Sequence, residues 1–243
     1  MKYVIFAHRV LANILFEILI TIIDLSASMD TKDWKPSRKA GALEANKQLI
    51  RVKARYHPQD KIGIIGFGTE AELLHEPVCV DDGADSLFEV LESPPCMGST
   101  NFTAALELAE SWLFGSTKPP RKHSTRKGFA RFLSELLYGP ALQSTEDIRV
   151  YSSAGNVVKR LIMLTDGHHW DGPSPLRAAG RLKEAGVIID CIGIGGSPED
   201  VDQKILRKIA SCNPDGSVRY CFIGEQQDLI RKYENLAHHI RSV

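Results

Sequence analysis

The sequence predicts a single α/β domain built on a doubly wound, mostly parallel central sheet, with helices on both faces and one short antiparallel edge strand. Two observations lead to this fold class. Short apolar runs alternate with longer amphipathic stretches along the 243 residues, which is the order expected of strands joined by crossover helices. The apolar runs also contain few polar residues, as expected for parallel strands that are buried on both faces.

The first predicted strand is the apolar run Glu17–Ile23, which ends in Asp24. Later elements follow from the same kind of run or from apolar residues at helical spacing. In order, they are a helix over Ser37–Tyr56, a strand over Lys61–Phe67, an antiparallel strand over Ala71–His75, helices over Ala84–Leu91 and Asn101–Phe114, a strand over Arg160–Leu164, a helix over Ser174–Ala185, a strand over Val187–Ile194, a helix over Glu199–Ser211, a strand over Val218–Ile223 and a helix over Gln226–Ile240. Ser99 and Thr100 are candidates for capping the Asn101–Phe114 helix.

Two segments do not fit this alternation within the predicted domain, which spans residues 1–243. Residues 1–16 are predicted to be an N-terminal extension that packs on the domain. The apolar stretch to which they belong has a membrane anchor as its alternative, but it includes Arg9 and Glu17, and each charge at the bilayer centre costs about 2.5–3.5 kcal/mol. No membrane is therefore expected. Residues 115–156 are too long for an ordinary connection and are predicted to be an insertion with a basic tract over Lys118–Lys127 and a helix over Phe129–Tyr138.

The composition indicates which partners and which cellular compartment to expect. The 30 Lys and Arg residues balance 30 Asp and Glu residues, so no general attraction to nucleic acid or to an anionic membrane is expected. The five cysteines are scattered, odd in number and without a Cys-x-x-Cys pair. This pattern predicts free thiols in a reducing compartment, so a cytoplasmic location is expected and a structural zinc site is not.

Oxygen-bearing side chains occur in loops at three strand–helix junctions. They lie in Asp24–Ser28, directly after the first strand, in Gly98–Asn101, before a helix, and in Thr165–Gly167, after another strand. Open parallel sheets bind their ligands at the carboxyl ends of the strands. Carboxylates and hydroxyls are hard ligands that suit Mg²⁺ or Mn²⁺. The predicted metal-site residues are Asp24, Ser26, Ser28, Thr100 and Asp166.

These three motifs, Asp-x-Ser-x-Ser, Gly-Ser-Thr-Asn and Thr-Asp-Gly, resemble the metal-ion-dependent adhesion site of von Willebrand factor A domains and integrin I domains. The resemblance covers about residues 17–240 and implies that Ser26, Ser28 and Thr100 contact the metal directly. Asp24 and Asp166 would act largely through bound water. Two positions depart from the common pattern, because Ala27 and Ser99 stand where glycine is frequent; neither supplies a ligand oxygen.

The resemblance also implies a function. A domain of this kind is a binding module and not an enzyme, and it captures an Asp or Glu of a partner protein by coordination to the metal. Intracellular members of the family commonly work beside AAA+ ATPases or in multi-protein assemblies, which makes such a protein the candidate partner.

Other interpretations compete with this one. Asp24 and Ser26 are also ordinary capping and turn residues. A magnesium-dependent phosphotransfer enzyme similar to the haloacid dehalogenase group could use an Asp after the first strand as its nucleophile, but it needs a second Asp where Ser26 stands. A nucleic-acid role for the basic insertion is not favoured, because the tract lacks interleaved aromatic residues. His168, His169 and Trp170 either line the ligand face or form a solvated loop.

Overall fold

The computed structural model of the chain describes residues 16–115 and 157–238. Four predicted features lie outside these residues or extend beyond them: the N-terminal extension, the 115–156 insertion with its basic tract, the helix over Phe129–Tyr138, and the end of the last helix at Ile240. Within the described ranges, no helix combines the length and the apolar character that a membrane crossing would need.

The described residues form one six-stranded sheet in the order β3-β2-β1-β4-β5-β6. Every neighbouring pair is parallel except β2 and β3, which are antiparallel. This arrangement confirms the predicted fold class. The strands are β1 (Phe16–Asp24), β2 (Lys61–Phe67), β3 (Ala71–Cys79), β4 (Val157–Thr165), β5 (Ile188–Ile194) and β6 (Tyr220–Ile223).

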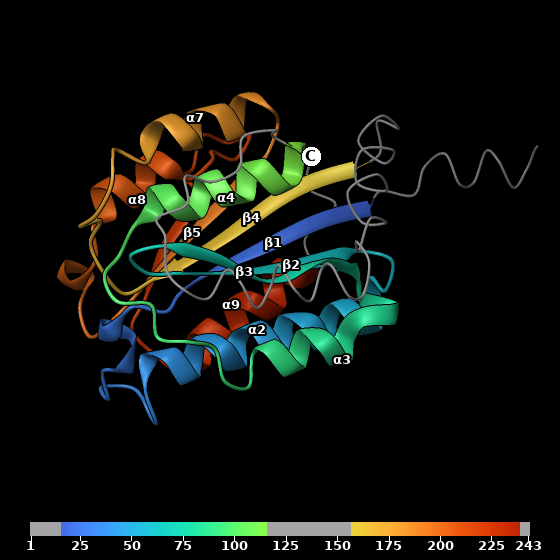
Figure 1. The fold of residues 1–243 in the computed structure, drawn as a ribbon, viewed down its shortest axis with the longest axis horizontal. Helices are drawn as coiled ribbons and strands as arrows, with labels where there is room; N and C mark the ends of the chain where they lie inside the picture. The colour runs from blue at the N-terminus through green and yellow to red at the C-terminus, as the bar shows by residue number, and fades with distance from the viewer. Residues whose placement is uncertain (1–15, 116–156, 239–243) are drawn as a thin grey trace, which may run out of the picture.

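Helices cover both faces of the sheet, as Figure 1 shows. One layer contains α2 (Arg38–Tyr56), α3 (Val80–Val90) and α9 (Gln226–His238), and the other contains α4 (Phe102–Phe114), α7 (Leu176–Glu184) and α8 (Gln203–Ile209). The apolar side chains of β1 alternate between the two layers. Leu19 and Ile23 belong to the core beneath α2 and α9, and Ile18, Ile20 and Ile22 to the core beneath α4 and α7. A strand buried on both faces is apolar at most of its positions for this reason.

The order of the strands positions the functional site. β1 and β4 are parallel neighbours in the middle of the sheet, and the chain leaves β1 toward β2 on one side but continues from β4 to β5 on the other. The loops that follow β1 and β4 therefore diverge to opposite sides. This is the topological switch point at which open α/β sheets bind their ligands.

Several predicted boundaries were wrong. β3 has nine residues and is longer than the predicted Ala71–His75 strand, and α3 begins at Val80 instead of Ala84. The predicted Glu199–Ser211 helix is two shorter elements, because the Asp202 side chain accepts a hydrogen bond from the Ile205 N–H and starts a new helix there. The first of the two is the 3₁₀ turn η2 (Pro198–Asp200).

Candidate metal site

Asp24 is the last residue of the central strand β1 and is fully buried. One carboxylate oxygen accepts the backbone N–H of Ser26 at 2.8 Å, and the other accepts the hydroxyl of Thr165, at the end of β4, at 2.6 Å. Because both oxygens are held, the carboxylate has a fixed orientation. Asp24 thus joins the loop after β1 to the strand that precedes the third predicted loop.

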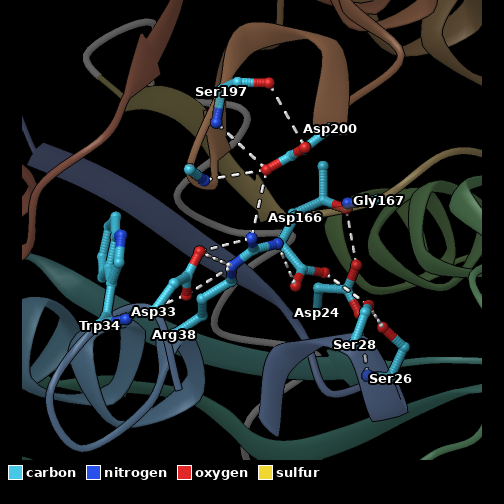
Figure 2. A network of polar contacts seen from close by, with 12 residues as sticks. Asp24, Ser26, Ser28, Asp33, Trp34, Arg38, Asp166, Gly167, Ser197 and Asp200 are labelled. Atoms are coloured by element: carbon cyan, nitrogen blue, oxygen red, sulfur yellow. Dashed lines mark hydrogen bonds and ion pairs between the residues drawn. The ribbon is translucent and has the colours of Figure 1, made fainter. Parts of the chain in front are cut away.

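A chain of hydroxyls connects the first loop to the third (Figure 2). The Ser28 hydroxyl donates to Asp166 Oδ1 at 2.7 Å, and Ser26 Oγ lies 3.0 Å from Ser28 Oγ. Since the Ser28 proton is directed at Asp166, the Ser26 hydroxyl is the donor between the two serines. Ser26 and Asp166 are buried whereas Ser28 is exposed, so the group is open to a ligand on the Ser28 side.

Thr100 reaches the same place from the second loop. It is 3% exposed, and a Cβ built on Gly167 would lie 3.5 Å from Thr100 Oγ1 and 3.9 Å from Ser28 Oγ. The two hydroxyls therefore face the same backbone segment. Within the described ranges, the Thr100 side chain accepts and donates no hydrogen bond, which leaves its oxygen available to a ligand.

The expectation that Ser99 or Thr100 caps α4 was wrong. Asn101 is the N-cap, and its side-chain oxygen accepts the Ala104 N–H at 3.1 Å. The Asn101 amide group also donates to the Thr69 carbonyl at 3.2 Å. Because Asn101 satisfies the start of the helix, the Thr100 hydroxyl is not needed there.

Backbone hydrogen bonds fix the three loops against one another. The Met97 N–H donates to the Leu25 carbonyl at 2.9 Å, and the Ala27 N–H donates to the Gly98 carbonyl at 3.0 Å. The Trp170 N–H donates to the Thr100 carbonyl at 3.0 Å. With the side-chain bonds described above, each loop is thus connected to the other two. All five predicted site residues come together at the carboxyl end of β1 and β4.

Ala27 and Ser99, which stand where glycine is frequent in the family, do not strain their loops. Among the described residues, no amino acid other than glycine has a positive φ, so neither Ala27 nor Ser99 occupies a conformation that requires glycine. The left-handed position of the second loop is filled by Gly98, with φ of 78°.

The site concentrates negative charge in a buried place. Burial raises the pKa of Asp24 to about 6, against the lowering effect of its hydrogen bonds with Ser26 and Thr165. Burial also raises the pKa of Asp166, and the hydrogen bonds from Ser28 and Arg38 oppose that rise. A raised carboxyl pKa means that the charged form lacks the hydration it would have in water. A cation bound beside these groups would compensate for that loss.

Arg38, which contacts Asp166 on the side away from Ser28, was not predicted from the sequence. The Arg38 guanidinium lies among three carboxylates, those of Asp33, Asp166 and Asp200 (Figure 2). Nothing in the local pattern distinguishes Arg38 from the other basic residues of α2, and Asp166 is 128 residues away along the chain. Only the fold brings them together.

The His168–Trp170 segment follows neither of its two predicted roles completely. His169 Nδ1 accepts the Phe102 N–H at 3.2 Å, its ring stacks on Phe102, and its Nε2 donates to the Pro173 carbonyl at 3.0 Å. The His169 ring therefore supports the start of α4. Trp170 is 74% exposed.

The donor set suits a hard cation that keeps some of its water. The residues that converge offer hydroxyl and carboxylate oxygens, the ligand type of Mg²⁺ and Mn²⁺. In the two described ranges, no group of three or more His, Cys, Asp or Glu side chains could hold a metal ion, so any ion at this place depends on the Ser and Thr hydroxyls. All five cysteines are free thiols.

Comparison with known proteins identifies the fold and the family. Two sequence models of the von Willebrand factor type A domain match the chain, one over residues 19–169 and the other over residues 136–233. No curated protein is detectably similar in sequence.

Many solved structures resemble the fold. A von Willebrand factor type A protein from Catenulispora acidiphila has 18% identity and a TM-score of 0.64, with 92% of this chain and 42% of that one covered. Proximal thread matrix protein 1 from the mussel byssus, described with a zinc-occupied MIDAS motif, has 16% identity and a TM-score of 0.62, with 92% and 48% covered. The SpRpn10 VWA domain has 19% identity and a TM-score of 0.58, with 92% and 95% covered. The chain thus spans less than half the length of the first two.

Proposed function

This chain belongs to the von Willebrand factor type A domain family, and we propose that it binds a divalent cation at a metal-ion-dependent adhesion site. Ser26, Ser28 and Thr100 are the direct ligands in this proposal. Asp24 and Asp166 orient bound water and the serine hydroxyls from behind. The observation that carries the proposal is the convergence of these five side chains, from three loops, at the switch point of the sheet.

The proposed role of the cation is to bind an acidic side chain of a partner protein. Domains of this family are generally protein-interaction modules. With hydroxyls as the direct ligands, the ion keeps most of its positive charge, and a carboxylate from outside can complete its coordination shell. The exposed side of Ser28 is the direction from which that carboxylate would approach. An AAA+ ATPase or a multi-protein assembly in the cytoplasm is the candidate setting.

The oxygen donor set favours Mg²⁺ or Mn²⁺ as the bound ion. The mussel protein named above is described with zinc at the equivalent type of site. The oxygen ligands of this chain nevertheless predict that zinc is not required.

The phosphotransfer alternative is less well supported. A nucleophilic carboxylate needs one oxygen free to attack its substrate, but both oxygens of Asp24 are held by Ser26 and Thr165. The position of the general acid and base is occupied by Ser26, which has no carboxyl group. The nucleic-acid alternative depends on residues 118–131, which lie outside the described ranges.

The proposal is tested by the effect of metal on thermal stability. A ligand that binds only the folded state at about 100 times its Kd adds about 2.7 kcal/mol, which raises the Tm of a domain this size by several degrees. We expect Mg²⁺ or Mn²⁺ to raise the Tm of the wild type, measured by differential scanning calorimetry after treatment with EDTA. The double variant Ser26→Ala with Thr100→Ala should lose this shift.

The matched control for the double variant is Ser99→Ala, which removes a neighbouring hydroxyl that is not a proposed ligand and makes no hydrogen bond within the described ranges. It should respond to metal as the wild type does. A double variant that keeps the wild-type response, with an unchanged far-UV circular dichroism spectrum, would show that the ion binds elsewhere.

A further inference from the structure

We propose that Arg38 is a positioning residue for the metal site. It holds Asp166 in the orientation that Ser28 requires and joins it to Asp200 of the 3₁₀ turn η2, which follows β5. This inference rests on the proposed function, because it concerns the same cation. It adds three residues, Asp33, Arg38 and Asp200, that neither the sequence motif nor the family match assigns to the site.

The Asp166 carboxylate is held from both sides. Arg38 Nη1 donates to Asp166 Oδ2 at 3.2 Å, and the Ser28 hydroxyl donates to Asp166 Oδ1 at 2.7 Å. With one donor on each oxygen, rotation of the carboxylate would break a hydrogen bond in a buried place, where an unpaired polar group is costly. The direction of the Ser28 hydroxyl, a proposed metal ligand, therefore depends on Arg38 through Asp166.

Arg38 is itself held in one orientation. Its side chain is 10% exposed. Nε lies 3.0 Å from each oxygen of Asp33, and Nη2 lies 2.6 Å from Asp33 Oδ2. Nη2 also donates to Asp200 Oδ2 at 3.2 Å. This is the planar, forked geometry that a guanidinium can satisfy and a lysine ammonium cannot.

Asp200 connects Arg38 to the loop between β5 and η2. Asp200 Oδ2 also accepts the N–H groups of Gly196 at 2.9 Å and Ser197 at 3.2 Å. A Cβ on Gly195 would lie 2.7 Å from Asp200 Oδ2, so a side chain at that position would displace the carboxylate. The loop after β5 thus contacts the metal site by way of one side chain, although it supplies none of the proposed ligands (Figure 2).

The positive charge of Arg38, taken alone, would weaken metal binding, whereas the proposed positioning role strengthens it. A cation near a metal ion repels it, so if Arg38 acted only through its charge, its removal would strengthen metal binding. If Arg38 positions Asp166, its removal weakens metal binding. Loss of a residue that orients a metal-site group typically lowers metal affinity by about 10- to 100-fold. The sign of the change therefore separates the two roles.

The experiment compares Mn²⁺ affinity in four proteins by isothermal titration calorimetry: the wild type, Arg38→Gln, Arg38→Lys and Lys39→Gln. Arg38→Gln should bind Mn²⁺ about 10- to 100-fold more weakly than the wild type. Arg38→Lys should not restore the affinity, since a lysine cannot contact all three carboxylates. Lys39→Gln is the matched control, because it removes the same charge from the next residue, whose partner is the exposed Asp30.

A second measurement in EDTA separates positioning from a general loss of stability. Arg38→Gln, Asp166→Asn and the double variant are unfolded in urea without metal. If the two residues interact, the effects of the single changes on the unfolding free energy are not additive. Additive effects would overturn the proposed contact.

The possible failures can be told apart. An Arg38→Gln protein that binds Mn²⁺ as tightly as the wild type, or more tightly, overturns this inference and leaves the proposed function standing. An Arg38→Lys protein with wild-type affinity also overturns it, because charge without the fork would then be sufficient. A wild type that binds no Mn²⁺ overturns the proposed function and this inference together.

Discussion

Asp24 combines two properties that oppose each other. It is fully buried, which disfavours its charged form, and it accepts two hydrogen bonds, which favour that form. Burial is the larger effect, so the pKa of Asp24 is about 6 in the folded protein and near its ordinary value of 3.8 in the unfolded chain. The folded state consequently binds a proton more tightly than the unfolded state does.

This pKa difference predicts how the metal-free protein responds to pH. A raised carboxyl pKa contributes stability below about pH 4 that is lost as the pH rises through about 6. The difference between these two pKa values corresponds to about 3 kcal/mol. In EDTA, the wild type should lose up to about this amount between pH 4 and pH 7.5, relative to Asp24→Asn, which accepts the Ser26 N–H but does not titrate.

Urea unfolding of the two proteins at a series of pH values measures the difference, because the contributions of groups that do not interact with Asp24 cancel. Parallel stability curves for the wild type and Asp24→Asn would contradict the expectation.

At the scale of elements, the start of helix α4 shows how adjacent residues serve as helix cap and as proposed metal ligand. Gly98–Asn101 supplies both the proposed ligand Thr100 and the N-cap Asn101, in adjacent positions. The sequence predicted Ser99 or Thr100 as the cap, although Asn101 is an equally good residue type for that position. The choice among them depends on where the loop leaves the sheet edge, which is decided by the contacts of the loop with Leu25, Ala27 and Gly68.

We predict that Asn101→Ala destabilises the protein by about 1–2 kcal/mol, because it removes the N-cap and its hydrogen bond to Thr69. Ser99→Ala, two residues earlier, should change the stability by less than about 0.5 kcal/mol, as is usual for surface positions. Urea unfolding in EDTA provides the measurement. Equal effects of the two substitutions would mean that the helix is capped differently in solution.

At the scale of the whole molecule, the two ends of the sheet differ in how their charged side chains are paired and exposed. The carboxyl end holds the open site described above. The amino end holds a buried group of acidic and basic side chains, in which Lys53 Nζ lies 2.5 Å from Glu17 and 2.7 Å from Asp60. Arg160 continues the group to Asp190, at 2.6 Å. These ion pairs connect α2, β1, β4 and β5 at the end of the sheet opposite the metal site.

Lys53→Met is predicted to destabilise the protein by about 3–5 kcal/mol, because Glu17 and Asp60 would be left buried without their cation. The matched control is Lys47→Met on the same helix, which breaks a pair with the exposed Glu92. That change should cost at most about 1 kcal/mol. The comparison is made by urea unfolding, and similar costs for the two variants would contradict a buried role for Lys53.

The sequence by itself determined the doubly wound sheet, the antiparallel edge strand and the five residues that meet at the carboxyl end of the central strands. These follow from local signals: an apolar run that ends in Asp24, and short polar motifs at strand–helix junctions. Helix boundaries were less predictable where capping choices are close in energy, as at Asp202 and Asn101.

Only the tertiary structure decided which other residues support the site. The Thr165 hydroxyl contacts Asp24, and Arg38 contacts Asp166, each across more than a hundred residues of chain. Asp200 contacts Arg38 from the 3₁₀ turn η2. A lone arginine among many basic residues has no local pattern that distinguishes it. Its partners are set by the packing of α2 against the sheet, because hydrogen bonds act over about 3 Å and depend on where the folded elements lie.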